Sequence, residues 1–473
     1  MADQARQGLE AVEVVEPPRA ASIRRQNWKG TITYYPAVVE AVRTVDDIVR
    51  IVKDRARYPS PVRAAGSQHS KTGCIEANQG TILDVTGMNR IVAIDREAMT
   101  ITMQPGVLHI DAARELERQG LQFHVNIELG NMTVGSGACC GTKESAFPGG
   151  WGQVCSYLIA ARLVLPSGEL LHVTEDQPEL LRAVRSSYGL LGVLYEVTFR
   201  VRPLQAMAVR HVAYTVDEFA DRLPELLATA DASNQSMMLY MFPPLDRLVV
   251  EYRRYVDGPV TSHWQWRLRN FVWATFAPLY AAVLTRIVPV RAVRYWLFDV
   301  FARLNVFTLT RLIRGGHTSP ADQIIRYPKR SGLAAYTFSI WTFPEAEYAQ
   351  SIRAYFRFCR DYQKRHGFRS NMLSVGYRVS RDTQSLFSYS GRENMMTLDP
   401  VSTGDAGWEA FLDAYNAFSI EYKGRPLWNQ SPQITPAQAK AAMADEIAAF
   451  QEIRRRHDPT GRMYPQFFLD LFE

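Results

Sequence analysis

The fold of this chain is indicated most clearly by residues 61–70, which read Pro61-Val62-Arg63-Ala64-Ala65-Gly66-Ser67-Gln68-His69-Ser70. A β-type run ends there in a turn that contains glycine, serine and histidine. A second such turn lies at 135–142, in a stretch (130–152) that holds seven of the 29 glycines. Because glycine permits positive φ and close approach, backbone N–H groups in these turns can reach phosphate oxygens. Together the turns predict a site for one diphosphate, whereas each alone fits a purely structural turn equally well.

The spacing within both turns argues against two common nucleotide sites. Neither has the G-x-x-x-x-G-K-[ST] pattern of ATP-binding loops or the G-x-G-x-x-G pattern of Rossmann folds. The sequence therefore argues against binding of ATP or of a Rossmann-bound nicotinamide. The surrounding sequence alternates short helical and β-type segments, and 130–152 is expected to be mostly loop. This alternation predicts an α+β lobe. Its expected elements are a helix opening at 44–47, strands at 61–65, 81–85, 91–94, 100–103 and 195–201, a helix near 112–116 and a hairpin at 163–171.

The length of 473 residues predicts more than one domain, because single cores stop growing well below this size. From about residue 204 the chain changes to longer, aromatic-rich segments. We therefore expect a first lobe at 20–203, a second lobe at 204–420 and a C-terminal segment at 421–473.

The net charge of +6 is concentrated in residues 261–320, which carry eight arginines and one acid, Asp299. The apolar run 271–284 lies inside this segment and has 14 residues, fewer than the roughly 20 needed to span a bilayer. Arginine mixed with aromatic and aliphatic residues is typical of a membrane-surface or lipophilic-partner region. The alternative is a helical part packed on itself or on a second subunit. Nucleic-acid binding is not expected, since no groove-reading motif accompanies the charge.

The five cysteines and nine histidines predict neither a metal site nor a disulfide framework. The cysteines form an odd set with no C-x-x-C pair, and no two histidines are three to five residues apart. A reducing compartment fits this usage better. Residues 1–6 lead into a polar stretch without an apolar signal region, so we expect a cytoplasmic protein, with peripheral membrane contact as an option.

The order of several motifs resembles the FAD-binding domain of the vanillyl-alcohol-oxidase superfamily. The aldonolactone and alditol oxidases are the most similar branch, and the resemblance covers about 27–470 with a weakly matched middle. The motifs are Asn27-Trp28-x-Gly30, residues 61–70, Ile82-Leu83-Asp84, Met88-Asn89-Arg90-Ile91, Pro105-Gly106-Val107, Thr133 to Ala138 with Gly141-Thr142, Tyr188 to Val193, Gly424-Arg425-Pro426-x-Trp428 and Arg456-His457-Asp458-Pro459-x-Gly461-Arg462.

This resemblance implies a two-lobed α+β flavoprotein. Residues 20–203 would bind FAD, 204–420 would form an α+β cap with the basic apolar insertion 261–320, and 421–473 would return to the interface between FAD and substrate. The implied cofactor-binding residues hold the diphosphate through backbone N–H groups or face the flavin. They are Gly66, Ser67, Gln68, His69, Ser70, Thr133, Gly135, Ser136, Gly137, Gly141, Thr142, Gly192 and Val193.

Some residues near the implied flavin deserve separate interpretations. His69 occupies the position at which covalent members of the branch bond a histidine to the flavin 8α-methyl; the alternative is an ordinary turn histidine. Cys139 and Cys140 are interpreted as small buried fillers. Gly137 falls where the superfamily controls oxygen access, and Lys143 replaces the histidine of a Gly-Thr-His-Gly run.

The substrate side departs further from the sugar oxidases of the branch. Their Glu-x-Arg pair reads Gly376-Tyr377-Arg378 here, and their His-Trp-Gly-Lys run reads Leu427-Trp428-Asn429-Gln430. Losing these groups removes hydrogen bonds that would recognise a polyol. Arg378, which would neutralise a developing alkoxide, and Gln430, which would donate a hydrogen bond, are the candidate catalytic residues. No general base is identified.

The resulting prediction is an FAD-dependent oxidoreductase that oxidises an alcohol by hydride transfer to flavin N5, with oxygen or another electron acceptor. Its substrate is a small molecule less polar than a sugar, lipophilic or lipid-linked. Two alternatives stay open: an aldonolactone oxidase or dehydrogenase with an ascorbate-like product, and a non-catalytic binding module on a flavoprotein fold.

Overall fold

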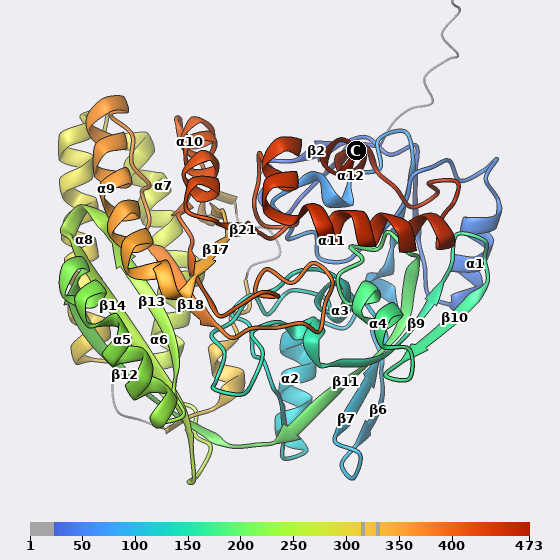
Figure 1. The fold of residues 1–473 in the computed structure, drawn as a ribbon, viewed down its shortest axis with the longest axis horizontal. Helices are drawn as coiled ribbons and strands as arrows, with labels where there is room; N and C mark the ends of the chain where they lie inside the picture. The colour runs from blue at the N-terminus through green and yellow to red at the C-terminus, as the bar shows by residue number, and fades with distance from the viewer. Residues whose placement is uncertain (1–22, 314–316, 328–331) are drawn as a thin grey trace, which may run out of the picture.

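A computed structural model describes residues 23–313, 317–327 and 332–473 (Figure 1). Its helices and several separate sheets confirm the predicted α+β class. The polar N-terminal residues 1–6 and Arg314, one of the eight arginines of 261–320, lie outside the described residues.

The N-terminal lobe contains a small parallel sheet and a larger antiparallel one, which lie on the right of Figure 1. The parallel sheet has the order β3 (Val38–Ala41), β5 (Thr81–Asp84), β4 (Val62–Ala65). The antiparallel sheet has the order β10 (Leu170–Thr174), β9 (Leu158–Val164), β11 (Val193–Pro203), β7 (Thr100–Met103), β6 (Ile91–Asp95), and β8 (Leu121–Phe123) pairs with β11. The lobe also holds β1 (Arg25–Gln26), β2 (Thr33–Tyr34), α1 (Val45–Lys53), α2 (His109–Arg118), α3 (Val134–Cys139) and α4 (Pro178–Val184).

Local sequence signals explain where α1 begins. The Asp47 N–H donates to Thr44 Oγ1 at 3.2 Å, and the Thr44 N–H donates to the Asp47 carboxylate at 3.1 Å. This reciprocal capping box satisfies two N–H groups at the start of the helix. Ile48, Ile51 and Val52 then form its buried face.

Residues 134–139 form the short helix α3, and the rest of 130–152 contains no further helix, so this stretch is mostly loop, as expected. Glycine is required there by packing. A Cβ on Gly135 would lie 2.7 Å from Pro105 Cβ, and one on Gly137 would lie 3.0 Å from Met132 Cε. Close approach to neighbouring segments therefore accounts for these two glycines.

The second lobe is built on an eight-stranded sheet. The chain enters it between the end of β11 at Pro203 and the start of β12 at Ala206, where the sequence changes character. The strand order is β15 (His317–Thr318), β12 (Ala206–Thr215), β14 (Arg247–Val256), β13 (Ser236–Phe242), β18 (Ser374–Val379), β19 (Met395–Leu398), β17 (Trp341–Pro344), β21 (Arg425–Pro426), and a separate pair joins β16 (Thr337–Phe338) to β20 (Val401–Ser402).

Helices cover the two faces of this sheet differently. Along β13, Met237, Leu239 and Met241 pack with the helices of one face, whereas Met238 and Tyr240 join the core that continues into the N-terminal lobe. This alternation follows the two-residue period of a strand. The first face is covered by α5 (Val216–Ala232), α9 (Tyr348–His366) and α10 (Trp408–Glu421).

The basic apolar segment forms helices α6 (Trp264–Phe271), α7 (Ala277–Ile287) and α8 (Arg291–Arg311), with a π-helical turn at Val272–Phe276. Within the described ranges, no helix is long and apolar enough to cross a membrane. Twelve of the 17 large hydrophobic side chains exposed among the described residues belong to this segment, and we call them the apolar patch. They are Trp264, Leu268, Phe271, Phe276, Leu279, Ile287, Val290, Val293, Trp296, Leu304, Phe307 and Leu312.

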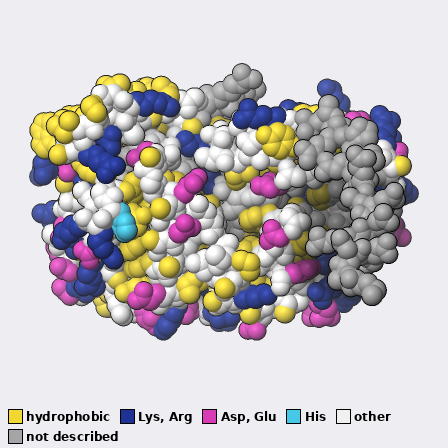
Figure 2. Space-filling view, turned by 90° about the horizontal axis from the view of Figure 1, so that it is seen from above, with side chains coloured by type: hydrophobic (Ala, Val, Ile, Leu, Met, Phe, Trp, Pro, Cys, Tyr) yellow, Lys and Arg dark blue, Asp and Glu magenta, His cyan; other side chains and the backbone are white. Residues whose placement is uncertain are grey.

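Figure 2 shows hydrophobic and basic side chains gathered together at its upper left, the end of the molecule where Figure 1 places α7 and α8. One arginine of the segment does not belong to this surface. Arg269 is only 2% exposed, since it forms an ion pair with Glu128 inside the protein. The basic surface is therefore smaller than its sequence count indicates.

The C-terminal segment packs back onto the N-terminal lobe through α11 (Pro436–His457) and α12 (Gln466–Phe472), at the top right of Figure 1. Arg462 is fully buried and donates to the carbonyls of Ile51 and Val52 at 3.0 and 3.2 Å. These are carbonyls of the last turn of α1, which have no partner within the helix. The end of the chain thus completes an element near its beginning.

Candidate active site

A first cavity lies where the two predicted turns meet. It encloses about 940 Å³ and is lined by segments near 63–75, 132–140 and 188–194, together with Asn429 and Gln430. A Cβ on Gly66 would overlap the Thr133 side chain. The absence of a side chain at Gly66 therefore lets the two turns lie against each other.

Arg63 holds the walls of this cavity together. Its guanidinium is buried and donates to the carbonyls of Tyr188 (2.5 Å), Cys74 (2.7 Å), Met463 (2.8 Å) and Gly189 (3.2 Å). Burial lowers the pKa of Arg63, but an arginine stays protonated in proteins. One charged group thus joins two loops and the C-terminal segment.

The C-terminal segment closes the same cavity at Asn429. The Lys71 N–H donates to the Asn429 carbonyl at 2.8 Å, and the Ser70 hydroxyl donates to the same oxygen at 3.1 Å. The Asn429 side chain in turn donates to the Gly141 carbonyl at 3.1 Å. Both predicted turns are therefore hydrogen-bonded to one residue near the end of the chain.

His69 lies in the wall of the first cavity, with its ring stacked on Trp28 at a centroid distance of 5.0 Å. It is 7% exposed, and its Nδ1 has no hydrogen-bond partner among the described residues. Burial lowers the pKa of His69 to about 3, and nearby Lys71 adds to the effect. A neutral imidazole with an unused buried nitrogen therefore faces the place where a ligand would bind.

Nine of the thirteen predicted cofactor residues line the first cavity, while Gly141 and Thr142 line a second one and Gly137 and Val193 line neither. The cavity fits FAD, because it is walled by two glycine-containing backbone segments and holds the unused Nδ1 of His69. Backbone N–H groups of such segments suit a diphosphate. The nine residues are Gly66, Ser67, Gln68, His69, Ser70, Thr133, Gly135, Ser136 and Gly192. Cys139 and Cys140 also line the cavity, and all five cysteines are free.

The second cavity opens from the first and encloses about 900 Å³. Leu129, Met132 and Gln430 line both cavities, so a molecule in the second would lie next to one in the first. Most of its lining is apolar or aromatic, with Glu128, Lys143 and Asp399 as the ionisable acids and bases. The apolar and aromatic residues include Trp273, Tyr327, Tyr336, Phe338, Ile340, Met372, Val375, Tyr377, Val401 and Leu427.

The two predicted catalytic residues have different positions. Gln430 lies at the junction of the cavities, and its side-chain Oε1 is buried without a partner among the described residues. Arg378 lines neither cavity, because its guanidinium binds Asp231 and Glu345 at 2.6 Å each. Its neighbour on β18, Tyr377, lines the second cavity instead. The strand therefore presents Tyr377 to the cavity, and the expected catalytic position of Arg378 is wrong.

Two ionic groups in the second cavity escaped sequence analysis. Glu128 pairs with Arg269 of α6 and accepts from the Tyr377 hydroxyl at 3.3 Å. Lys143 pairs with Asp399, which follows β19. Lys143 itself is visible in the sequence as a departure from the Gly-Thr-His-Gly pattern, but its partner, Asp399, lies 256 residues away. No local sequence pattern signals that contact.

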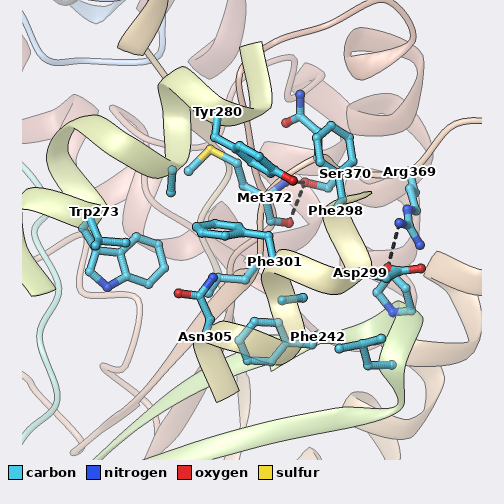
Figure 3. A pocket seen from close by; sticks show the side chains of 17 residues that line it. Phe242, Trp273, Tyr280, Phe298, Asp299, Phe301, Asn305, Arg369, Ser370 and Met372 are labelled. Atoms are coloured by element: carbon cyan, nitrogen blue, oxygen red, sulfur yellow. Dashed lines mark hydrogen bonds and ion pairs between the residues drawn. The ribbon is translucent and has the colours of Figure 1, made fainter. Parts of the chain in front are cut away.

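A third, apolar cavity adjoins the second through Trp273 and Met372, which line both. Figure 3 shows Tyr280 of α7 and Phe298 and Phe301 of α8 gathered around it. Asp299 at its edge is paired with Arg369 at 2.8 Å. The inner faces of α7 and α8 therefore line this cavity, while their outer faces carry the apolar patch.

Comparison with known proteins agrees with this arrangement. Residues 36–174 match the FAD binding domain family. L-gulonolactone oxidase of Scyliorhinus torazame is 22% identical over 94% of this chain and 98% of its own. L-gulonolactone oxidase of Bos taurus and L-gulono-1,4-lactone dehydrogenase of Mycobacterium tuberculosis are each 24% identical, over 52% and 50% of this chain and 54% of their own.

Solved structures show the same fold over nearly the whole chain. Cholesterol oxidase from B. sterolicum superposes with a TM-score of 0.73 at 13% identity, covering 99% of this chain and all of that one. A solvent-stable cholesterol oxidase gives 0.72 at 14% identity, covering 95% and 97%. The chain is therefore an FAD-dependent oxidoreductase with the two-lobed fold of these cholesterol oxidases, and the curated relatives named above are oxidases and dehydrogenases of gulonolactones.

Proposed function

We propose that this protein oxidises the hydroxyl-bearing carbon of a lipophilic alcohol, which it takes from a membrane surface. FAD, when bound in the first cavity, supplies the acceptor for the hydride. The alcohol lies in the second cavity, and its hydrocarbon part extends toward the third. Gln430, at the junction, has a buried Oε1 without a partner among the described residues, which can accept a hydrogen bond from the substrate hydroxyl.

The observation that carries this proposal is the continuity of apolar lining from Gln430 to α7 and α8. Aromatic side chains line both the second and the third cavity, which share Trp273 and Met372. A polyol would leave most of its hydroxyl groups without partners against these walls, at about 1–3 kcal/mol for each. A hydrocarbon chain loses nothing there and gains from burial.

The apolar patch supports delivery from a membrane. It lies on the helices that also wall the third cavity, and arginines lie among its residues. Side chains of this mixture bind at the boundary between headgroups and acyl chains, while arginine interacts with anionic lipid. A substrate could thus pass from the bilayer to the cavity without crossing water.

His69 is the proposed attachment point if the flavin is covalently bound. Its ring is neutral at neutral pH, and its buried Nδ1 has no partner among the described residues; a neutral ring nitrogen is what a carbon–nitrogen bond requires. Such a bond would hold the cofactor and raise its potential. Electrons then leave to oxygen or another acceptor.

The test is anaerobic bleaching of the bound flavin by a panel of donors. A long-chain primary alcohol, a prenol and a sterol in detergent micelles are compared with a short-chain alcohol and with gulono-1,4-lactone. We expect bleaching by at least one lipophilic donor and none by the lactone. Bleaching by the lactone alone would overturn the proposal in favour of an aldonolactone substrate, the compound class in the names of the curated relatives.

A further inference from the structure

We infer that Asp399 is the group that accepts the proton of the substrate hydroxyl, and that Lys143 holds this carboxylate in place. The inference rests on the proposed function, since it requires that a C–OH group be oxidised in the second cavity. It assigns the base that neither the sequence nor the resemblance supplied.

The two residues come from different lobes of the protein. Lys143 directly follows Gly141 and Thr142, and Asp399 follows the last residue of β19. Their side chains form an ion pair, and Lys143 Nζ lies 3.5 Å from the centre of the Tyr377 ring. The Thr397 hydroxyl donates to Asp399 Oδ2 at 2.8 Å. The carboxylate is thus fixed through one of its two oxygens.

We assign the other oxygen to the substrate hydroxyl. Asp399 is fully buried, and its Oδ1 has no hydrogen-bond partner among the described residues. A buried carboxylate oxygen without a partner is costly, so a donor that enters the cavity gains this interaction. A substrate hydroxyl is such a donor, and its hydrogen bond would lie on the path of proton transfer.

The remaining polar groups of the cavity are less suited to take a proton. Glu128 already binds Arg269 and accepts from Tyr377. The Tyr336 hydroxyl donates to Tyr327 at 2.8 Å, and burial raises the pKa of both phenols. Gln430 is an amide and cannot act as a base. Among the described residues that line the cavity, Asp399 is therefore the one best suited to accept the proton.

The surroundings of Asp399 suit a base at neutral pH. Burial raises its pKa to about 6, while Lys143 and the Thr397 hydroxyl oppose this rise. Asp399 is then ionised at pH 7 yet basic enough to take a proton, as efficient general bases are. The ionisable groups that face it from the packed elements are Lys143, Tyr348, Tyr377, Tyr389 and Tyr415.

The proposed oxidation conserves atoms and electrons. The substrate O–H bond breaks and its proton goes to Asp399 Oδ1. The C–H bond breaks and its hydrogen leaves with both electrons to FAD, so the carbon–oxygen bond becomes double. The substrate loses two electrons and FAD gains two. Asp399 returns its proton to solvent when the product leaves.

The test compares Asp399→Asn with Asp382→Asn, a matched change at another fully buried carboxylate that lines none of the three cavities. The rate constant of anaerobic flavin reduction is measured between about pH 5 and 9 with the lipophilic donor that bleaches the wild type fastest. We expect the wild-type rate constant to rise with pH through about 6, and we expect Asp399→Asn to lower it about 10²–10⁴-fold and to abolish this pH dependence. Asp382→Asn should keep the pH dependence of the wild type.

A second readout needs no substrate. The infrared difference spectrum, wild type minus Asp399→Asn, is expected to show one band of a protonated carboxyl group. This band should appear as the pH falls through about 6. Lys143→Met should shift that midpoint upward, because it removes the opposing ammonium. Retention of the reduction rate within threefold in Asp399→Asn, or absence of the band, would overturn the inference.

The outcomes keep the two proposals apart. If no lipophilic alcohol bleaches the flavin but gulono-1,4-lactone does, the proposed function fails, and the same variants are measured with the lactone as donor. The rate constant of flavin reduction by the lactone and the infrared band then test the role of Asp399. If a lipophilic donor works and Asp399→Asn is unimpaired, only the assignment of the base fails.

Discussion

His69 has one unused ring nitrogen in a cavity wall, and this determines what its removal should do. If the nitrogen bonds the flavin, denatured wild-type protein carries yellow cofactor into an acid precipitate. We expect His69→Ala to release FAD into the supernatant and to retain the fold, because the surrounding turn is held by backbone contacts with Asn429. Absorption spectra of pellet and supernatant give the answer.

The matched control for this experiment is His109→Ala. His109 is also fully buried with a pKa lowered by burial, but it lies on α2 and lines none of the three cavities. Flavin that is equally released by acid from the wild type and from both variants would show that the cofactor is held without a covalent bond.

Lys71 predicts how stability changes with pH. It is 5% exposed, and Nζ lies 5.0 Å from the centre of the Phe338 ring and 5.3 Å from that of Trp28. Burial lowers its pKa from 10.5 to about 7. Between these values the unfolded chain binds one more proton than the folded protein, so this residue makes stability rise with pH across that window.

We therefore expect the difference in melting temperature between wild type and Lys71→Met to grow in favour of the wild type from pH 7 to about 10. Differential scanning calorimetry at several pH values measures it. Lys364→Met, at a lysine whose side chain is 78% exposed, should give a difference that does not vary over this range. A pH-independent difference for Lys71→Met would contradict the assignment.

At the scale of elements, the apolar patch on α6–α8 predicts membrane binding. Replacing Trp264, Trp296 and Phe307 with serine removes three side chains that are each nearly 60% exposed. Since burial of one such side chain contributes about 1.5 kcal/mol or more, affinity for anionic phosphatidylglycerol vesicles should fall at least about a hundredfold. Vesicle co-sedimentation measures this, and added salt should weaken wild-type binding.

A matched triple variant tests whether the position of the patch matters. Tyr35, Val92 and Leu170 are exposed hydrophobic residues of the N-terminal lobe, and their replacement with serine should leave vesicle binding unchanged. Equal binding by both triple variants would exclude membrane docking through α6–α8 and favour contact with a second subunit.

Many helices and strands could be predicted from local sequence. The capping box at Thr44, the strands near 62–65 and 81–84 and the hairpin after Leu163 depend on neighbours in the chain, and all appear. Both predicted turns also meet in one cavity. The errors concern contacts across the fold. The burial of Arg269 depends on Glu128, and the pairing of Lys143 with Asp399 joins distant segments.

At the scale of the whole molecule, the C-terminal segment ties the two ends of the chain together. We expect Arg462→Met to cost about 2–3 kcal/mol, because two carbonyls at the end of α1 lose their buried donor. Thermal unfolding followed by circular dichroism, together with flavin release, measures it. Arg456→Met removes only an exposed pair with Glu452 and should have little effect. Similar melting temperatures for both variants would argue against this role of Arg462.

The wall of the first cavity is completed by Asn429 and Gln430, which the ribosome adds after both lobes. A nascent chain that has emerged only as far as the second lobe has both glycine turns but lacks the residue to which they are hydrogen-bonded. Stable capture of the cofactor is therefore expected only after residues 429 and 430 have left the ribosome, and the N-terminal lobe produced alone should remain colourless.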